Sequence, residues 1–225
     1  MSADRRLKFF AAMCAAALCL AASPSNAALV INEIDPNQTS SVDMFEFVEL
    51  AGPALLSLNG YTVVFFNGAT DVSYQAFDLD GYQLGPTGYL LLGNASVVPT
   101  SDIIFPNITL QNGADAVALY VGNASDFPNG TAVTTTNLVD AIVYGGSANP
   151  IDSGLLTGLG QSTQYIDTDT TSISRVPDGM AGNFTENTTP TPTSSGIPQV
   201  PEPAGAALFG VMALIVSGRR AGRAG

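Results

Sequence analysis

The sequence predicts an all-β domain built as an antiparallel β-sandwich, and two observations support this fold class. From Ala28 onward, short runs of β-branched and aromatic residues alternate with clusters of Gly, Pro, Asn and Asp, a pattern typical of strands joined by turns. No segment before the C-terminal tail shows the hydrophobic period of a helix. Several short strands punctuated in this way are expected to form two packed sheets.

Residues 1–27 have the parts of a secretory signal peptide. Basic residues lie at the start of an apolar run over residues 7–22, and Ser25 and Ala27 place small residues at the positions that determine cleavage. We expect export, with cleavage after Ala27. The alternative is an N-terminal membrane anchor, but the run is shorter than the roughly 20 residues that a spanning helix needs.

The domain that follows is expected to cover residues 28–182. Its first stretch, residues 29–52, contains two apolar runs on either side of a polar loop with a proline, which predicts two strands and a connection. The expected strands, in chain order, are 29–34, 44–51, 61–67, 73–77, 88–92, 116–121, 138–144 and 172–176.

The composition excludes several kinds of chemistry. Both cysteines lie in the signal peptide and there is no histidine, so disulfides, thiol nucleophiles and Ser-His arrangements are excluded from the exported domain. Arg175 is the one basic residue between the signal peptide and the C-terminal tail, and the formal net charge is −12. Because such a domain repels phosphate, we expect no nucleic-acid partner.

Residues 183–199 are rich in Thr, Pro, Ser and Asn and are expected to form a disordered linker. The last segment, residues 200–225, contains Pro201, Glu202 and Pro203, then an apolar run that predicts a short hydrophobic helix, and then a basic cluster with Arg219 and Arg220. An apolar run followed by arginines associates with a membrane with its basic end in the cytoplasm.

These three parts, in this order, resemble the PEP-CTERM sorting signal of Gram-negative bacteria. The resemblance implies that an exosortase, a membrane enzyme, recognises and removes the tail, so that association with the inner membrane is transient. It also implies delivery to the cell surface or the extracellular matrix. An ordinary C-terminal anchor is the alternative.

The carboxylates of the opening stretch need partners. Glu46 and Glu49 are three residues apart, so an extended chain places them on opposite faces, and one should point inward. An inward carboxylate is costly unless it is paired. We therefore predict a structural clamp in which Arg175 binds Glu46 or Glu49; the alternative is an exposed arginine with a loose partner.

Three other carboxylate patterns carry alternative functions. A pairing of Glu46 or Glu49 with Glu33 or Asp35 would suit a carboxylate-dependent hydrolase acting on polysaccharide. Residues 152–154, Asp-Ser-Gly, resemble the surroundings of an aspartic-protease carboxylate, but a turn is the favoured interpretation. The acids of residues 78–81 and 167–169 offer oxygens for a weak calcium site, without the full spacing of a calcium loop.

A series of short motifs resembles bacterial lamin tail domains. In order they are INEI (31–34), EFVEL (46–50), LNGY (58–61), GYLLL (88–92), LQNGADAVAL (110–119), LVDAIVY (138–144) and the closing segment 172–179. The resemblance implies an immunoglobulin-like sandwich that serves as a non-enzymatic binding or structural module. No catalytic residues or cofactors carry over from it. With the export signals, it implies adhesion or matrix binding, with an extracellular polysaccharide or a surface protein as partner.

Overall fold

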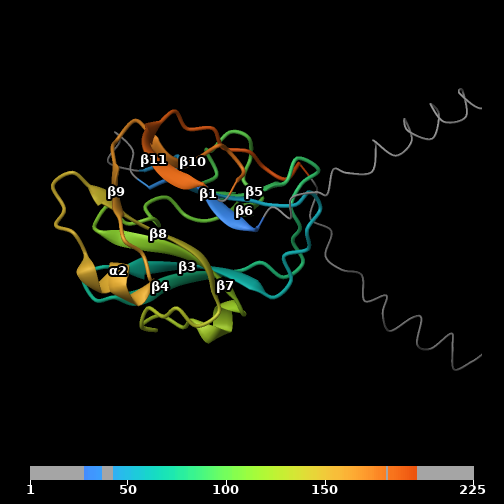
Figure 1. Cartoon of the computed structure of the whole chain (residues 1–225). Coiled ribbons are helices and arrows are strands. Elements are labelled where there is room, and N and C mark those ends of the chain that lie inside the picture. The colour runs from blue at the N-terminus through green and yellow to red at the C-terminus, as the bar shows by residue number, and fades with distance from the viewer. Residues whose placement is uncertain (1–27, 37–42, 181, 197–225) are drawn as a thin grey trace, which may run out of the picture.

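The computed structural model describes residues 28–36, 43–180 and 182–196 (Figure 1). The predicted cleavage residue Ala27 and the predicted sorting residues Pro201, Glu202, Pro203, Arg219 and Arg220 lie outside the described residues. So does the expected C-terminal hydrophobic helix.

The described chain is mostly strands. They are β1 Val30–Asp35, β2 Phe47–Ala51, β3 Tyr61–Asn67, β4 Val72–Asp78, β5 Tyr89–Gly93, β6 Ile103–Ile104, β7 Asp115–Val121, β8 Leu138–Gly146, β9 Gln164–Asp167, β10 Ser172–Val176 and β11 Asn183–Thr188. A 3-10 helix, η1 Ala124–Asp126, and an α-helix, α2 Ser153–Gly158, complete the set. Each expected strand is present; the ranges 61–67 and 172–176 match to the residue, and the others are shifted at one or both ends. The short strands β6, β9 and β11 and the two helical turns were not predicted.

The strands form two sheets, which lie one above the other in Figure 1. One has the order β11-β10-β1-β2-β5-β6 and the other the order β4-β3-β7-β8-β9. The expectation of purely antiparallel pairing is wrong at two edges, because β6 runs parallel to β5 and β9 runs parallel to β8. In both cases the connecting segment brings the chain back to run in the same direction as the preceding strand. Such a connection has no hairpin turn, so the turn signals of the sequence did not reveal the parallel pairing.

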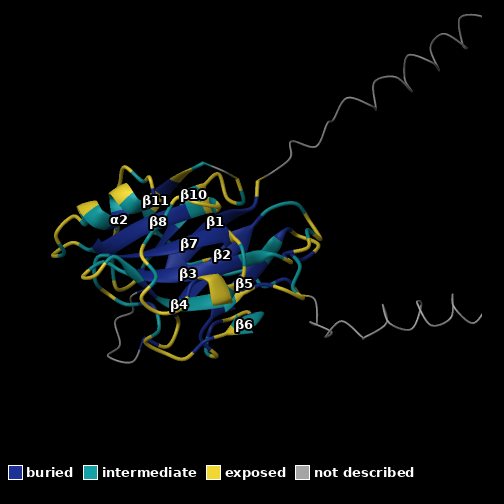
Figure 2. Cartoon of the chain, turned by 90° about the horizontal axis from the view of Figure 1, so that it is seen from below, coloured by how far each residue is buried: buried dark blue, intermediate teal, exposed yellow. Residues whose placement is uncertain are grey.

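The main hydrophobic core lies between the two sheets. It includes alternate residues of the central strands, such as Ile34, Val48, Phe65, Val117 and Ile142. A second cluster covers the outer face of the five-stranded sheet, and the segment between β7 and β8, with Phe127 and Val133, packs over it together with α2. The central strands are therefore buried on both faces, as Figure 2 shows. In β7 this burial matches a continuous apolar sequence after Asp115, whereas β1 and β2 carry Asn32, Glu33 and Glu49 at buried positions.

The predicted linker is wrong for its first part. Residues 183–188 form β11, which pairs with β10. Residues 189–196, here named the C-terminal strap, then cross the outer face of the six-stranded sheet, where Thr191, Thr193 and Ser195 are hydrogen-bonded to it. The approach is close at the far end, since a Cβ on Gly85 would overlap the main-chain oxygen of Ser195.

The turn expected at residues 152–154 is instead the start of α2. The side chain of Asp152 accepts a hydrogen bond from the amide of Leu155 at 2.9 Å and so caps the helix. Within the described ranges, no helix is long and apolar enough to cross a membrane.

Candidate functional site

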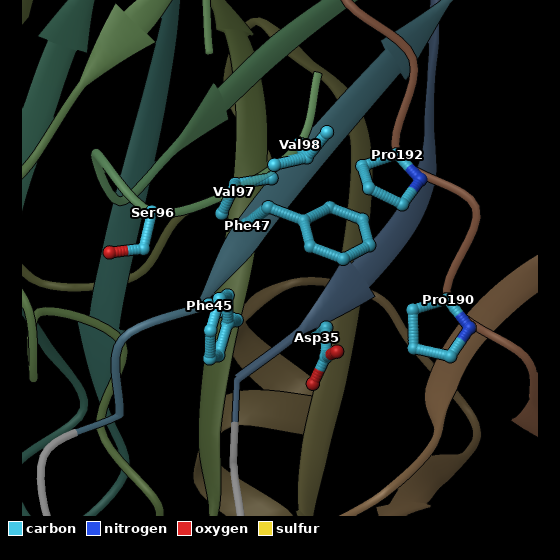
Figure 3. Close-up of a pocket in the computed structure, with 8 residues that line it drawn as sticks. All are labelled: Asp35, Phe45, Phe47, Ser96, Val97, Val98, Pro190 and Pro192. Carbon is cyan, nitrogen blue, oxygen red and sulfur yellow. The ribbon is translucent and has the colours of Figure 1, made fainter. Parts of the chain in front are cut away.

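The first candidate site is a groove at one end of the central strands of the six-stranded sheet (Figure 3). Its volume is about 300 Å³, and it is lined by Asp35, Phe45, Phe47, Ser96, Val97, Val98, Pro190 and Pro192. We name it the aromatic groove. The groove lies where β1 ends and β2 begins. Leu29 and Ser195, which are near the first and last described residues of the domain, lie at the opposite end of these strands.

The local sequence explains the apolar wall of this groove. Phe45 lies at a bend just before β2 and Phe47 is the first residue of β2, and both side chains line the groove. The Phe47 ring is buried against Val97 and Leu91 in a small hydrophobic cluster of its own. Phe45 is 49% exposed and Val98 is 83% exposed. The groove thus has a rigid buried floor and an accessible apolar rim.

The opposite wall is the C-terminal strap. Pro190 and Pro192 face Asp35 and the Phe47 ring across the groove (Figure 3). They belong to the sequence Thr-Pro-Thr-Pro-Thr, in which every second residue lacks an amide hydrogen. The threonines between them supply the hydrogen bonds that hold the strap.

A row of carboxylates receives these amide hydrogens. Thr191 donates its amide to Glu33 Oε1 at 3.0 Å and its hydroxyl to Glu33 Oε2 at 2.7 Å. Thr193 donates its amide to Glu49 Oε2 at 2.6 Å. Ser195 donates its amide and its hydroxyl to Asp102 at 2.7 and 2.6 Å. Because these acceptors lie on β1, on β2 and just before β6, the strap crosses the strands of this sheet one after another.

Two of these carboxylates are strongly perturbed. Glu33 and Glu49 are directly opposed in the β1–β2 register, and both are buried. Burial raises the pKa of Glu33, and it raises the pKa of Glu49 to about 8, with a further contribution from the Glu33 charge. The amide of Asn32, which bridges Glu49 and Asp178 at 2.6 Å each, opposes the rise in the Glu49 pKa.

Glu46 lies in a different environment. Its Oε2 accepts hydrogen bonds from Asn94 at 3.1 Å and from the amide of Thr109 at 3.0 Å. Burial raises its pKa to about 7. Glu46 and Glu49 have no hydrogen-bond partner in common, so they do not form a catalytic pair with each other.

The predicted clamp has the wrong carboxylate partner. The Arg175 guanidinium binds both carboxylate oxygens of Asp140 at 2.7 Å, and not Glu46 or Glu49. Its Nε also donates to the main-chain oxygen of Ile31 at 2.8 Å, and its Cζ lies 4.0 Å from the centre of the Phe184 ring. Asp140 is on β8, so the ion pair joins the two sheets. The side chains are 10% and 14% exposed, which excludes the alternative of a loose surface arginine.

A second cleft, of about 360 Å³, is polar and lies beside Gly68, Gln111, Asn149 and Asp152. Next to it Asp71 is hydrogen-bonded to Asp152, and burial raises the pKa of Asp71. Sequence reasoning missed this second acid because it is far away in the chain. Two carboxyl groups in direct contact are closer than the separation of about 5 Å or more in glycosidases. The hydrolase alternative named other carboxylates, and of its pairings the structure places Glu49 directly opposite Glu33 in the β1–β2 register.

Neither predicted calcium loop belongs to a group of three or more acidic side chains that could hold a metal ion within the described residues. The Asp78 and Asp80 carboxylates accept the amides of Asp80 and Gly60 at 3.0 and 2.6 Å, as turn acids do. Nowhere in the described part of the chain do three or more acidic, His or Cys side chains form a group that could hold a metal ion.

Comparisons with protein-family models, curated proteins and solved structures give no significant match to this chain.

Proposed function

We propose that the protein is an exported, non-enzymatic binding module with an immunoglobulin-like sandwich, and that its aromatic groove binds a neutral polysaccharide of the cell surface or matrix. The observation that carries this proposal is the groove itself, in which a half-exposed phenylalanine and two proline rings stand beside a carboxylate. A mostly apolar concavity with few polar groups is the usual form of a ligand site.

The chemistry of the groove favours sugar rings. A sugar presents an apolar face of C–H groups that can stack on the Phe45 ring, and its hydroxyls can donate to acceptors such as Asp35 and Ser96. Asp35 is 3% exposed and therefore fixed in position, which gives orientation to the bound ring.

The charge of the protein favours a ligand without acidic groups. The formal net charge is −12, and Arg175, the one basic side chain among the described residues, is held by Asp140. An anionic polysaccharide would meet repulsion at every approach. A surface protein is the alternative partner. Failure of every polysaccharide probe to bind would favour this alternative.

Replacing Phe45 with alanine is expected to weaken binding to a neutral polysaccharide about tenfold, since an aromatic contact contributes roughly 1–1.5 kcal/mol. The measurement is binding of dextran, soluble starch and cellohexaose as neutral probes, with polygalacturonate as the anionic probe. Val121→Ala is the matched control, because Val121 is 50% exposed but lies at the end of β7, outside the groove. Tighter binding of polygalacturonate, or equal binding by the Phe45 variant and the wild type, would contradict the proposal.

Export and tail removal form the second part of the proposal. They are supported by the composition of residues 1–27 and by the order of the Pro-Glu-Pro motif, apolar run and arginines in residues 200–225. The proposed processing partner is an exosortase of a Gram-negative cell envelope. Mass spectrometry of the native protein should find Ala28 as its first residue and no peptide containing Arg219. A mature protein that retains both ends would refute this part.

A further inference from the structure

The C-terminal strap contributes to the aromatic groove without belonging to either sheet. Among the described residues, Pro190 and Pro192 are the only groove residues that follow β11, and they form one wall of it (Figure 3). If the strap left the sheet, this wall would be removed, while the floor made by Phe47 and Val97 would stay in place.

The groups that hold the strap beyond Pro192 are outside the groove. Thr193 and Ser195 donate to Glu49 and Asp102, and none of these four residues lines the groove. The bonds are short, at 2.6–2.7 Å, and three donor groups converge on Glu49 and Asp102. Ser195 is 2% exposed, so this end of the strap is packed as well as hydrogen-bonded.

We propose that the docked strap is a component of the ligand site, and that Glu49, Thr193, Asp102 and Ser195 are positioning residues for a groove that they do not touch. This inference rests on the proposed function for its ligand. The ligand binds the docked form, so groove occupancy and strap docking stabilise each other by the same factor. When a change undocks the strap, the apparent association constant equals the intrinsic one multiplied by the fraction of molecules that remain docked.

The test uses the full chain with two prolines introduced, Thr193→Pro and Ser195→Pro. Each removes one amide donor, and neither residue has a positive φ that would forbid proline. The matched control is Thr189→Pro with Ser194→Pro, because neither of these residues contributes a hydrogen bond to the carboxylate row. Three quantities are measured: the hydrogen-exchange protection of the Thr191 amide, the methyl NMR shifts of Val97 and Val98, and the affinity for cellohexaose.

The Thr193/Ser195 variant is expected to lose protection at Thr191, to show shifted Val98 methyl signals and to bind cellohexaose about tenfold or more weakly. The control variant should behave as the wild type. A freed Thr191 amide with unchanged methyl shifts and unchanged affinity would overturn the inference, and so would a Thr191 amide that stays protected in the variant. If the wild type binds none of the neutral probes, the proposed function fails, and the methyl shifts still decide whether the strap shapes the groove.

Discussion

Replacing Arg175 with alanine is expected to lower the free energy of unfolding by about 3–5 kcal/mol, because it would leave the Asp140 carboxylate buried without a counter-charge. The same change removes a hydrogen bond to Ile31 and the contact with the Phe184 ring. Urea unfolding of the variant and the wild type, followed by far-UV circular dichroism, measures the difference.

A second variant separates the ion pair from the rest of the contact. Combining Arg175→Met with Asp140→Asn removes both charges but keeps an acceptor for the amide of Ile31. We expect the double variant to be more stable than Arg175→Ala alone, since no buried charge is left unpaired. A loss below about 1 kcal/mol in Arg175→Ala would show that the pair does not join the sheets energetically.

The second large effect is expected in the dependence of stability on pH. Glu49 and Glu46, with pKa values of about 8 and about 7 against an ordinary value of 4.5, keep their protons in the folded protein after the unfolded chain has released them. The folded state therefore binds more protons over this range, and stability falls as pH rises from about 4.5 to about 8. Glu33, whose pKa is also raised by burial, acts in the same direction.

The expected result is a free energy of unfolding that is highest near pH 4 to 5 and lower by several kcal/mol at pH 8. Urea titrations at a series of pH values would show it. In Glu49→Gln, which cannot ionise, the slope between pH 5 and pH 8 should become shallower, whereas Asp126→Asn, at an exposed turn, should leave it unchanged. Stability that increases from pH 5 to pH 8 would mean that these carboxylates are ionised and well solvated in the folded state.

The strands were predictable because their signal is local. The run Tyr61–Asn67 and the run Ser172–Val176 were predicted to the residue. The first is rich in β-branched and aromatic side chains, and the second is bounded by the Pro-Asp-Gly turn that follows Val176. Strands β6 and β9 were missed because they are short and lie at sheet edges, where pairing with a neighbour decides their conformation.

The strap was missed for a different reason. Thr-Pro repeats cannot bury enough apolar surface to fold by themselves, and this favours a linker when composition alone is considered. The structure holds the repeat through hydrogen bonds to Glu33 and Glu49, which lie more than a hundred residues earlier in the chain. The alternation of proline with residues that keep an amide hydrogen was the one available signal, because it restricts hydrogen bonding to one side of an extended segment.

For Arg175, the sequence predicted the ion pair but not the partner. A single basic residue among many acids indicated that Arg175 is paired, and the structure confirms a buried ion pair. The choice of partner depended on which sheet faces its side chain. Asp140 shares the inward face of β8 with Ile142 and Tyr144, and this depends on the packing of two sheets, which no local pattern specifies.

The most direct test of the proposed function is an NMR titration of the labelled protein with cellohexaose and dextran oligosaccharides. We predict that the signals of Phe45, Phe47, Val97 and Val98 shift on titration, while those of Gln111 and Asn149 in the polar cleft stay unchanged. Shifts confined to the polar cleft, or no shifts with any neutral sugar, would contradict the assignment of the aromatic groove as the ligand site.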